Sequence, residues 1–256
     1  MSDPHEIADA LLAAERTRTP IQPFTRNNPF LDTALGYAAQ ESLIEQKCAA
    51  GEWVVGFKLG LTSKVKRDAL GIHEPVYGRL TSNMLVPAGQ PLALDGLIHP
   101  RAEPEIALLI GRPIAPGASV ATVMAAVDAV YPAIEVVDSR YAQPFRLVDS
   151  VADNAGAARA VLGSRPRPPA DLVDLHVLGC VFGFRGGFDT AAGGAAMGHP
   201  AAAVAWLAGA LAQRGKRLEP GSIVLTGGLT AAVPVRPGDR IAAEFDGLGS
   251  IEVHGG

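Results

Sequence analysis

The stretch Arg101–Ile110, which reads RAEPEIALLI, places two glutamates two residues apart, just before a long apolar run. In a β-strand, residues two apart point to the same face, so Glu103 and Glu105 would be neighbours. The apolar run indicates a partly buried setting, in which two adjacent carboxylates repel each other. One of them then has to take up a proton, or a metal ion has to lie between them. The alternative is a solvated strand edge on which neither glutamate has a special role.

A second stretch, Tyr131–Arg140 (YPAIEVVDSR), places Glu135 between Ile134 and Val136 in another apolar strand. A lone buried carboxylate is rarely tolerated, so Glu135 is either paired with an arginine or is a metal ligand. Three carboxylates from two strands would fill half of an octahedral oxygen shell. Such a shell suits Mg²⁺ or Mn²⁺ and not zinc, and it leaves the remaining positions to substrate oxygens and water.

Two glycine-containing stretches could complete such a site. In Gly56–Ser63 (GFKLGLTS), Lys58 lies on the strand face opposite Phe57 and Leu59, and the flanking glycines permit close approach of a ligand. This lysine either holds a substrate carboxylate, transfers a proton if its pKa is lowered, or is simply exposed on a strand. In Thr226–Thr230 (TGGLT), backbone N–H groups and hydroxyls either contact a carboxylate or form a plain turn.

The rest of the pattern predicts many short strands with few helices between them. Because the order lacks a regular βαβ alternation, we predict a strand-rich α+β fold and not a Rossmann or barrel fold. Residues 1–51 are expected to form an N-terminal helical segment and residues 52–256 a catalytic domain, together making one structural unit. The expected strands are 53–61, 103–110, 133–137, 158–162, 175–184, 223–226, 240–245 and 250–254, and the expected helices are 5–16, 31–50, 119–130, 201–214 and a short helix ending at residue 70.

Composition excludes several classes of protein. The 256 residues are 48% hydrophobic and 19% charged, which is ordinary for a soluble globular protein, and the net charge of -4 argues against a nucleic-acid partner. Cys48 and Cys180 are too few for a disulfide framework or a cysteine-rich zinc site. The polar residues 1–6 do not resemble a signal peptide, and the apolar run 201–212 is too short for a bilayer. We therefore expect a cytoplasmic protein without a membrane partner.

The order of the motifs resembles the 2-oxopent-4-enoate hydratase and 4-oxalocrotonate decarboxylase family of the fumarylacetoacetate hydrolase superfamily, from about residue 30 onward. This resemblance implies a mixed β-roll with peripheral helices, Mg²⁺ or Mn²⁺ held by Glu103, Glu105 and Glu135, and Lys58 as the active-site lysine. The motifs that carry it are GFKLGLTS, PVYGRL, IHPRAEPEIA, IEVVDSRY, VADNAG, GHPAAAVAWLA, LTGGLTAAVPVRPGD and DGLGSIEV.

Three short sequence motifs favour the decarboxylases within this family. Hydratases typically have an aspartate, a candidate acid or base for water addition, where this chain has Val76. Decarboxylases tend to have an aliphatic residue there, together with the S-R-Y of Ser139–Tyr141 and the T-G-G-L-T-A-A-V of Thr226–Val233. One departure is Gly156, where relatives usually have a serine.

The resemblance implies metal-dependent decarboxylation of 4-oxalocrotonate (2-oxohex-3-enedioate) to 2-hydroxypenta-2,4-dienoate and CO₂, in meta-cleavage degradation of aromatic compounds. Relatives form homo-oligomers, and the decarboxylase often associates with a partner hydratase. The alternatives are a 2-hydroxypenta-2,4-dienoate hydratase, a non-catalytic ligand-binding relative and, more weakly, a C–C hydrolase. We expect substrate contacts from Gly60, Thr62, Ser63, Asn154, Gly228 and Thr230.

Overall fold

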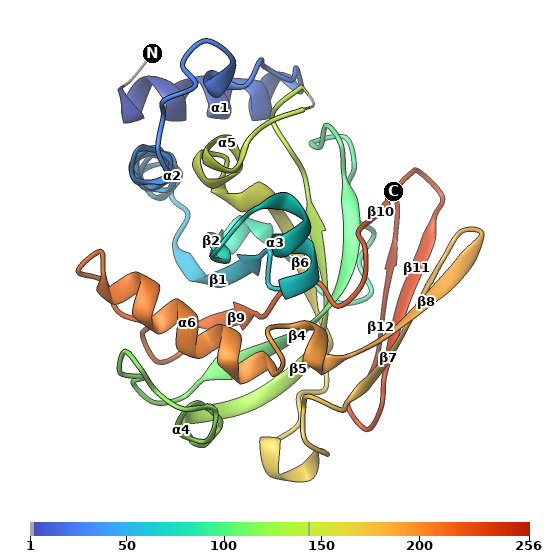
Figure 1. Cartoon of the computed structure of the whole chain (residues 1–256). Coiled ribbons are helices and arrows are strands. Elements are labelled where there is room, and N and C mark those ends of the chain that lie inside the picture. Colours follow the sequence, from blue (N-terminus) through green and yellow to red (C-terminus); the bar gives the residue numbers. More distant parts are fainter. Residues whose placement is uncertain (1–2, 143) are drawn as a thin grey trace.

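Two β-sheets packed together form the body of the protein, and helices cover its outside (Figure 1). The computed structural model describes residues 3–142 and 144–256, so the first two residues of the predicted helical segment lie outside the described residues. The mixture of helices and a curled sheet confirms the predicted α+β class.

The larger sheet carries the stretches that the sequence analysis singled out. Its strands follow the order β2-β1-β9-β4-β5-β6-β3, with β10 paired to β4. The parallel pairs are β1 with β9 and β3 with β6, and the other pairs are antiparallel. The strands are β1 (Val54–Gly60), β2 (Val76–Thr81), β3 (Leu85–Val86), β4 (Arg101–Ile110), β5 (Val127–Val137), β6 (Ala157–Leu162), β9 (Ile223–Leu225) and β10 (Val233–Pro234).

The smaller sheet packs against β5 through two of its strands. It has the order β12-β11-β7-β8, and all its neighbours are antiparallel. The large buried side chains Phe182 and Phe245 point from it into the main core. Its strands are β7 (Gly179–Phe184), β8 (Gly187–Ala192), β11 (Arg240–Phe245) and β12 (Gly249–His254).

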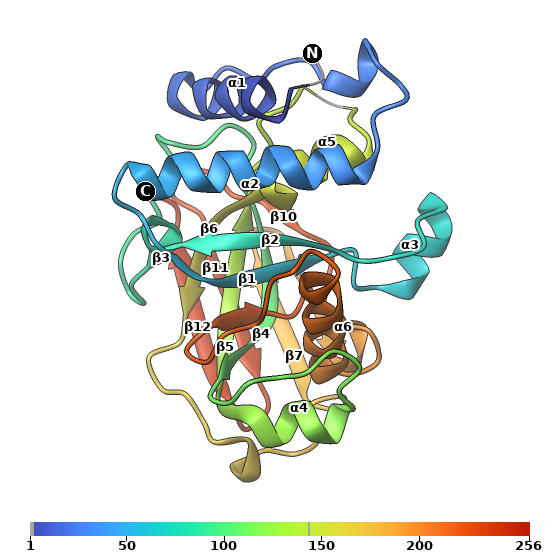
Figure 2. The ribbon, with the colours of Figure 1, turned by 90° about the vertical axis from the view of Figure 1, so that its left-hand side faces the viewer.

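Six α-helices surround the sheets, and α1, α2 and α5 gather at one end, beside β1 and β2 (Figure 2). Helix α1 begins after the N-cap Asp3 and buries Ile7, Leu11 and Ala14, which are spaced three or four residues apart. Asp32 caps α2 through Leu35 N in the same way. The helices are α1 (Pro4–Thr17), α2 (Thr33–Ala49), α3 (Lys64–Leu70), α4 (Val120–Ala126), α5 (Leu147–Ala152) and α6 (Pro200–Ala212).

Three predicted elements differ from the structure. The helix expected over 119–130 ends at Ala126, because the β-branched and apolar residues from Val127 onward pair with β4 and lengthen β5 to 11 residues. The strand expected over 175–184 begins only at Gly179. Strands β2, β3, β8 and β10 and helix α5 are absent from the prediction, since each has six residues or fewer and gives only a weak periodic signal.

Helix α6 and the turn before it, Gly193–Ala212, are the one segment of the described residues that is long and apolar enough to cross a membrane. Half of this segment is buried inside the protein. The helix packs with Val204, Leu207 and Leu211 in the main hydrophobic core, as the core helix of a globular fold does.

Candidate metal centre

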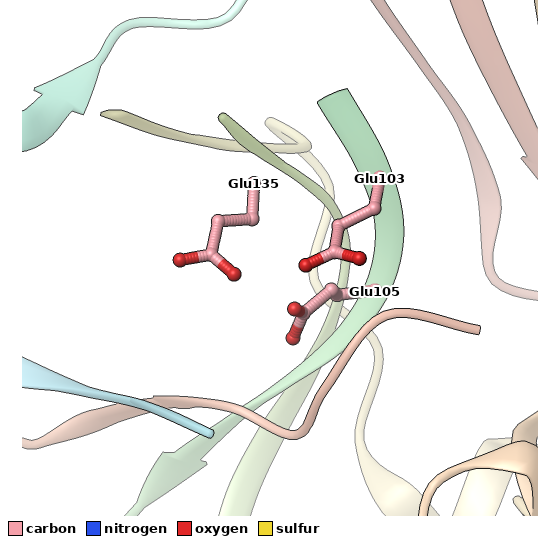
Figure 3. A group of neighbouring side chains, drawn as sticks. All are labelled: Glu103, Glu105 and Glu135. Carbon is pink, nitrogen blue, oxygen red and sulfur yellow. The ribbon is translucent and has the colours of Figure 1, made fainter. Parts of the chain in front are cut away.

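Three glutamates converge where β4 and β5 pair (Figure 3). Glu103 lies directly opposite Glu135 in the antiparallel register, and Glu105 follows on the same face of β4. One carboxylate oxygen from each residue lies within 4.8 Å of the others. Glu105 and Glu135 are fully buried, while Glu103 is half-buried. The structure therefore brings together the three side chains that the two sequence stretches placed on separate strands.

The carboxylates of this cluster lack partners for several of their oxygens. Both oxygens of Glu135 and Oε1 of Glu105 are buried without a hydrogen bond among the described residues. Oε2 of Glu105 accepts a hydrogen bond of 2.7 Å from Gly227 N. Since a buried unpaired oxygen costs about 1–3 kcal/mol, three of them in one place fit a ligand that is positively charged.

Electrostatics in the cluster favour a cation as well. Burial raises the pKa of Glu135 to about 7, although the charge of Lys58 opposes this shift. Burial, followed by the charges of Glu135 and Glu103, raises the pKa of Glu105 well above its ordinary value. Without an added positive charge the cluster resists full ionisation. The all-oxygen donor set fits a hard divalent cation such as Mg²⁺ or Mn²⁺.

Lys58 is the cation that this chain itself brings to the cluster. It is 2% exposed, and its Nζ lies 3.1 Å from Glu135 Oε2, a charge contact without the alignment of a hydrogen bond. Nζ also donates a hydrogen bond of 3.0 Å to the carbonyl of Ala155. Burial favours the neutral amine, but the charges of the three glutamates outweigh burial and raise the pKa of Lys58. The lowered pKa that would make this lysine a base is therefore not found in the cluster.

Glycines allow the loop after β9 to close over the carboxylates. A Cβ on Gly228 would lie 2.1 Å from Glu103 Oε2, and a Cβ on Gly227 would lie 2.1 Å from Thr62 Oγ1. Gly227 also has a φ of +110°, which side-chain-bearing residues rarely adopt. Both glycines are therefore required for steric reasons. The N–H group of Gly227 also donates a hydrogen bond to Glu105.

The other predicted substrate contacts divide into two groups. Gly60, Thr62 and Gly228 lie beside the cluster: a Cβ on Gly60 would be 4.0 Å from Lys58 Nζ, and Thr62 is buried against Gly227. The side chains of Ser63 and Thr230 have local partners. Ser63 caps α3 through Lys66 N, and the hydroxyl of Thr230 donates to the carbonyl of Ala231.

Asn154 has a different environment from the one expected of a substrate-binding residue. It is fully buried, and both polar atoms of its side chain are hydrogen-bonded to the backbone of Arg79. These bonds use one N–H and one lone pair of the amide, and the substrate contact expected of Asn154 stays a prediction.

Two features near Lys58 were not assigned a role from the sequence. The first is the carbonyl of Ala155, which nothing in the residue type distinguishes. The second is an apolar cluster in which Val76, Val151 and Ala155 are buried, with the partly buried Tyr37, Leu61 and Leu147 packed against them. Val76 lies next to Gly60, since a Cβ on that glycine would be 3.1 Å from Val76 Cγ2.

A mixed β-roll with a buried carboxylate cluster defines a class of metal-binding enzyme folds, and comparison with known proteins identifies the family. The family described as "Fumarylacetoacetate (FAA) hydrolase C-terminal" matches residues 58–254. The chain belongs to this fumarylacetoacetate hydrolase family. The resemblance stated from the motifs and the predicted β-roll are both confirmed.

The most similar relatives cover almost the whole chain. The 4-oxalocrotonate decarboxylase of Pseudomonas sp. (strain CF600) is 41% identical, over 96% of this chain and 94% of that protein. The 2-keto-4-pentenoate hydratase of Paraburkholderia xenovorans (strain LB400) is 37% identical, over 96% of this chain and 92% of its own length. Among solved structures, the 4-oxalocrotonate decarboxylase from Pseudomonas putida G7, complexed with magnesium and adipate, superposes with a TM-score of 0.94. It is 38% identical, and the match covers 98% of this chain and 96% of that one.

Proposed function

We propose that this chain is a metal-dependent decarboxylase that converts 4-oxalocrotonate to 2-hydroxypenta-2,4-dienoate and CO₂. The observation that carries the proposal is the trio of Glu103, Glu105 and Glu135, with buried unpaired oxygens and a single lysine against them. The 41% identity with a 4-oxalocrotonate decarboxylase over nearly the whole chain supports 4-oxalocrotonate as the substrate of this site.

The proposed cofactor is Mg²⁺ or Mn²⁺, held by the three glutamates. The related decarboxylase from Pseudomonas putida G7 has been solved with magnesium and adipate and with calcium and acetate. Adipate is a six-carbon dicarboxylate, as is the proposed substrate. When bound, the divalent cation supplies Lewis-acid stabilisation of the negative charge that develops on the substrate's C2 oxygen.

Lys58 is the residue of this chain proposed to act on the substrate directly. Its ammonium group lies at the edge of the carboxylate cluster, 3.1 Å from Glu135 and 3.0 Å from the carbonyl of Ala155. A substrate that reaches the trio therefore meets this ammonium group. We assign to Lys58 the orientation of a substrate carboxylate and the supply of a proton to the C2 oxygen.

The apolar cluster beside Lys58 suits the loss of a carboxylate better than the addition of water. Val76, Val151 and Ala155 offer no hydrogen bond from their side chains, and they are almost completely shielded from solvent. An apolar wall removes water from a departing carboxylate and so favours its release as neutral CO₂. It also provides no acid or base at position 76 to activate a water molecule.

The second candidate function is the hydration of 2-hydroxypenta-2,4-dienoate, because a hydratase is 37% identical over 96% of the chain. One assay separates the two functions. Purified protein is given either 4-oxalocrotonate or 2-hydroxypenta-2,4-dienoate, with Mg²⁺, Mn²⁺ or EDTA, while CO₂ and dienoate absorbance are recorded. The decarboxylase releases CO₂ only with metal, and a hydratase consumes added dienoate without releasing gas. A protein that does neither, and whose melting temperature responds to neither metal nor chelator, would be a non-catalytic relative.

We further propose that residues 1–51 and 52–256 form one structural unit. In support, Ile7 and Leu11 of α1 and Leu43 of α2 share a hydrophobic cluster with Tyr141 and Ala152, which follow β5. The proposal extends to a homo-oligomer in the cytoplasm, to a role in meta-cleavage degradation of aromatic compounds and to association with a partner hydratase. Size-exclusion chromatography with a co-purified hydratase tests the assembly.

A further inference from the structure

Three consecutive residues next to Lys58 have a left-handed backbone. Asn154, Ala155 and Gly156 have φ values of 53°, 52° and 72°, and only the last is a glycine. For Ala155 this conformation costs roughly 1–2 kcal/mol, whereas asparagine and glycine adopt it more readily. The segment, here named the 154–156 arch, is buried at Asn154 and Ala155. Such strain persists only where the surrounding structure holds it in place.

The side chain of Asn154 fixes the arch to strand β2. Its Oδ1 accepts a hydrogen bond of 2.7 Å from Arg79 N, and its Nδ2 donates one of 2.8 Å to Arg79 O. Strand β2 is the last strand on its side of the sheet, so this amide takes the place of a neighbouring strand. A Cβ on Gly78 would lie 2.2 Å from Asn154 O, which means that only glycine at 78 lets the arch approach.

A buried ion pair fixes the start of the arch. Asp153 contacts the guanidinium of Arg140, and Arg140 Nη2 also donates a hydrogen bond of 2.8 Å to the carbonyl of Asp153. Both side chains are nearly inaccessible to solvent. The residue before the arch is therefore anchored through its side chain and its backbone.

The arch ends at the proposed active site. The carbonyl of Ala155 accepts the hydrogen bond from Lys58 Nζ, and Lys58 lies opposite Gly78 in the register of β1 and β2. On its other side, Nζ lies 3.1 Å from Glu135 Oε2, at the edge of the glutamate trio. Without the Ala155 carbonyl, the ammonium group would be drawn between the carboxylates, into the space that a metal ion needs.

We propose that Asn154 is a positioning residue that acts through Lys58. By holding the arch on β2, its amide keeps the Ala155 carbonyl on the ammonium group and the ammonium group at the edge of the carboxylate cluster. This inference rests on the proposed function for its effect on turnover, but the coupling between Asn154 and Lys58 does not depend on the identity of the substrate.

The first test is Asn154→Gly, which removes both hydrogen bonds and still permits a left-handed backbone. With saturating Mg²⁺, we expect kcat to fall by about tenfold or more while KM changes by less than about threefold, because orientation of the lysine matters most in the transition state. If the glycine variant does not fold, Asn154→Asp retains the acceptor for Arg79 N and serves for the same measurements.

The matched control is Gln40→Ala. Gln40 is also fully buried, and its amide donates hydrogen bonds of 3.0 Å to Tyr77 O on the same strand and 2.9 Å to Val151 O. This variant should lose a similar number of degrees of melting temperature and keep its kcat. A kcat within twofold of wild type for the Asn154 variant, or an equal loss of kcat for the Gln40 variant, would overturn the proposal.

The second test uses stability alone. The melting temperatures of the metal-free wild type, Asn154→Gly, Lys58→Met and the double variant form a thermodynamic cycle. If Asn154 acts through Lys58, the loss caused by Asn154→Gly should be measurably smaller in the Lys58→Met protein, because the Lys58–Ala155 hydrogen bond is then already absent. Equal losses in both backgrounds would refute the coupling. A coupled cycle in a protein that releases no CO₂ would leave the positioning intact and refute the proposed reaction instead.

Discussion

The molecule buries two kinds of carboxylate, and they differ in how the chain satisfies them. Asp138 accepts hydrogen bonds from the backbone N–H groups of Ile98 and His99, and Asp149 accepts from Thr25 and Arg146. Glu105 and Glu135 are buried as deeply, yet three of their oxygens accept no hydrogen bond from the described residues, and one of the three has only the charge contact with Lys58.

The difference separates structural from functional charge. A carboxylate whose partners belong to the chain ties loops and helices together, and its burial is compensated at folding. The burial cost of a carboxylate whose oxygens accept no hydrogen bond from the chain is compensated when a ligand binds to it. The buried glutamates are therefore where a ligand is expected, and the buried aspartates are where stability is expected to depend on the side chain.

The largest expected effect comes from Glu135→Gln. The change removes one of the three carboxylates while preserving shape, so activity should fall by more than about a hundredfold, beyond the range typical of losing a group that only supports a metal ligand. The metal-free protein should melt no lower than wild type, because burial disfavours the charge of Glu135 by more than its contact with Lys58 favours it. Turnover with saturating Mg²⁺ and a thermal melt check both outcomes, and undiminished turnover would remove Glu135 from the ligand set.

Val76→Asp brings a buried charge into the apolar cluster beside Lys58. The new carboxylate should compete with the substrate for Lys58 and should bring water into the apolar cluster, so CO₂ release should fall by about tenfold or more. Val76→Ile is the matched control and should keep most of the activity. Stopped-flow measurement of CO₂ release compares the two variants. A fully active Val76→Asp protein would contradict the role given to the apolar cluster.

Addition of Mg²⁺ to the metal-free protein should raise its stability through the open carboxylates. At a hundred times the dissociation constant, binding contributes about 2.7 kcal/mol, which corresponds to roughly 5–10 °C in melting temperature for a chain of this size. Differential scanning fluorimetry measures the shift. Glu135→Gln should show little of it, and a full shift in that variant would place the ion elsewhere.

Asp149→Asn tests the other side of the comparison. Asp149 binds Thr25 through its N–H and its hydroxyl, and it also accepts from Arg146 N. An amide nitrogen facing these donors should cost about 1–3 kcal/mol of unfolding free energy. Urea denaturation gives that value, and kcat per folded molecule should stay at the wild-type level. Lost turnover without lost stability would contradict the division between the two kinds of carboxylate.

The smallest effect is expected from Glu41, a half-exposed carboxylate that bridges Arg79 and Lys216. Burial opposes ionisation, but hydrogen bonds from Lys216 and Arg79 outweigh it and lower the pKa of Glu41 below 4.5. The stabilisation is thus present above pH 4.5 and is lost as the pH falls through the lowered pKa. It should amount to less than about 1 kcal/mol at this exposure. Glu41→Gln should flatten the decline in melting temperature between pH 5 and 3.

The local sequence pattern predicted most of the strands and helices. It failed where pairing with a distant strand determines the secondary structure. Strand β4 was expected nearly in full, since an apolar run with Glu103 and Glu105 on one face is visible in the sequence. The first four residues of β5 are predicted as helix, because Ser119–Val130 has helical spacing and only pairing with β4 makes Val127 a strand residue. Strand β2, buried throughout, lacks the alternation that marks a half-buried strand.

The sequence alone determined the chemistry of this protein: which residues are acidic, which face of a strand they occupy and which family their order resembles. Tertiary structure decided everything that depends on register and close approach. It set Glu103 opposite Glu135, brought Gly227 and Gly228 onto the carboxylates, and hydrogen-bonded the Asn154 amide to Arg79 and Lys58 to the carbonyl of Ala155. The reason is physical, since side-chain type and period are local properties, while compensation of a buried charge depends on which distant atoms the fold places within about 3 Å.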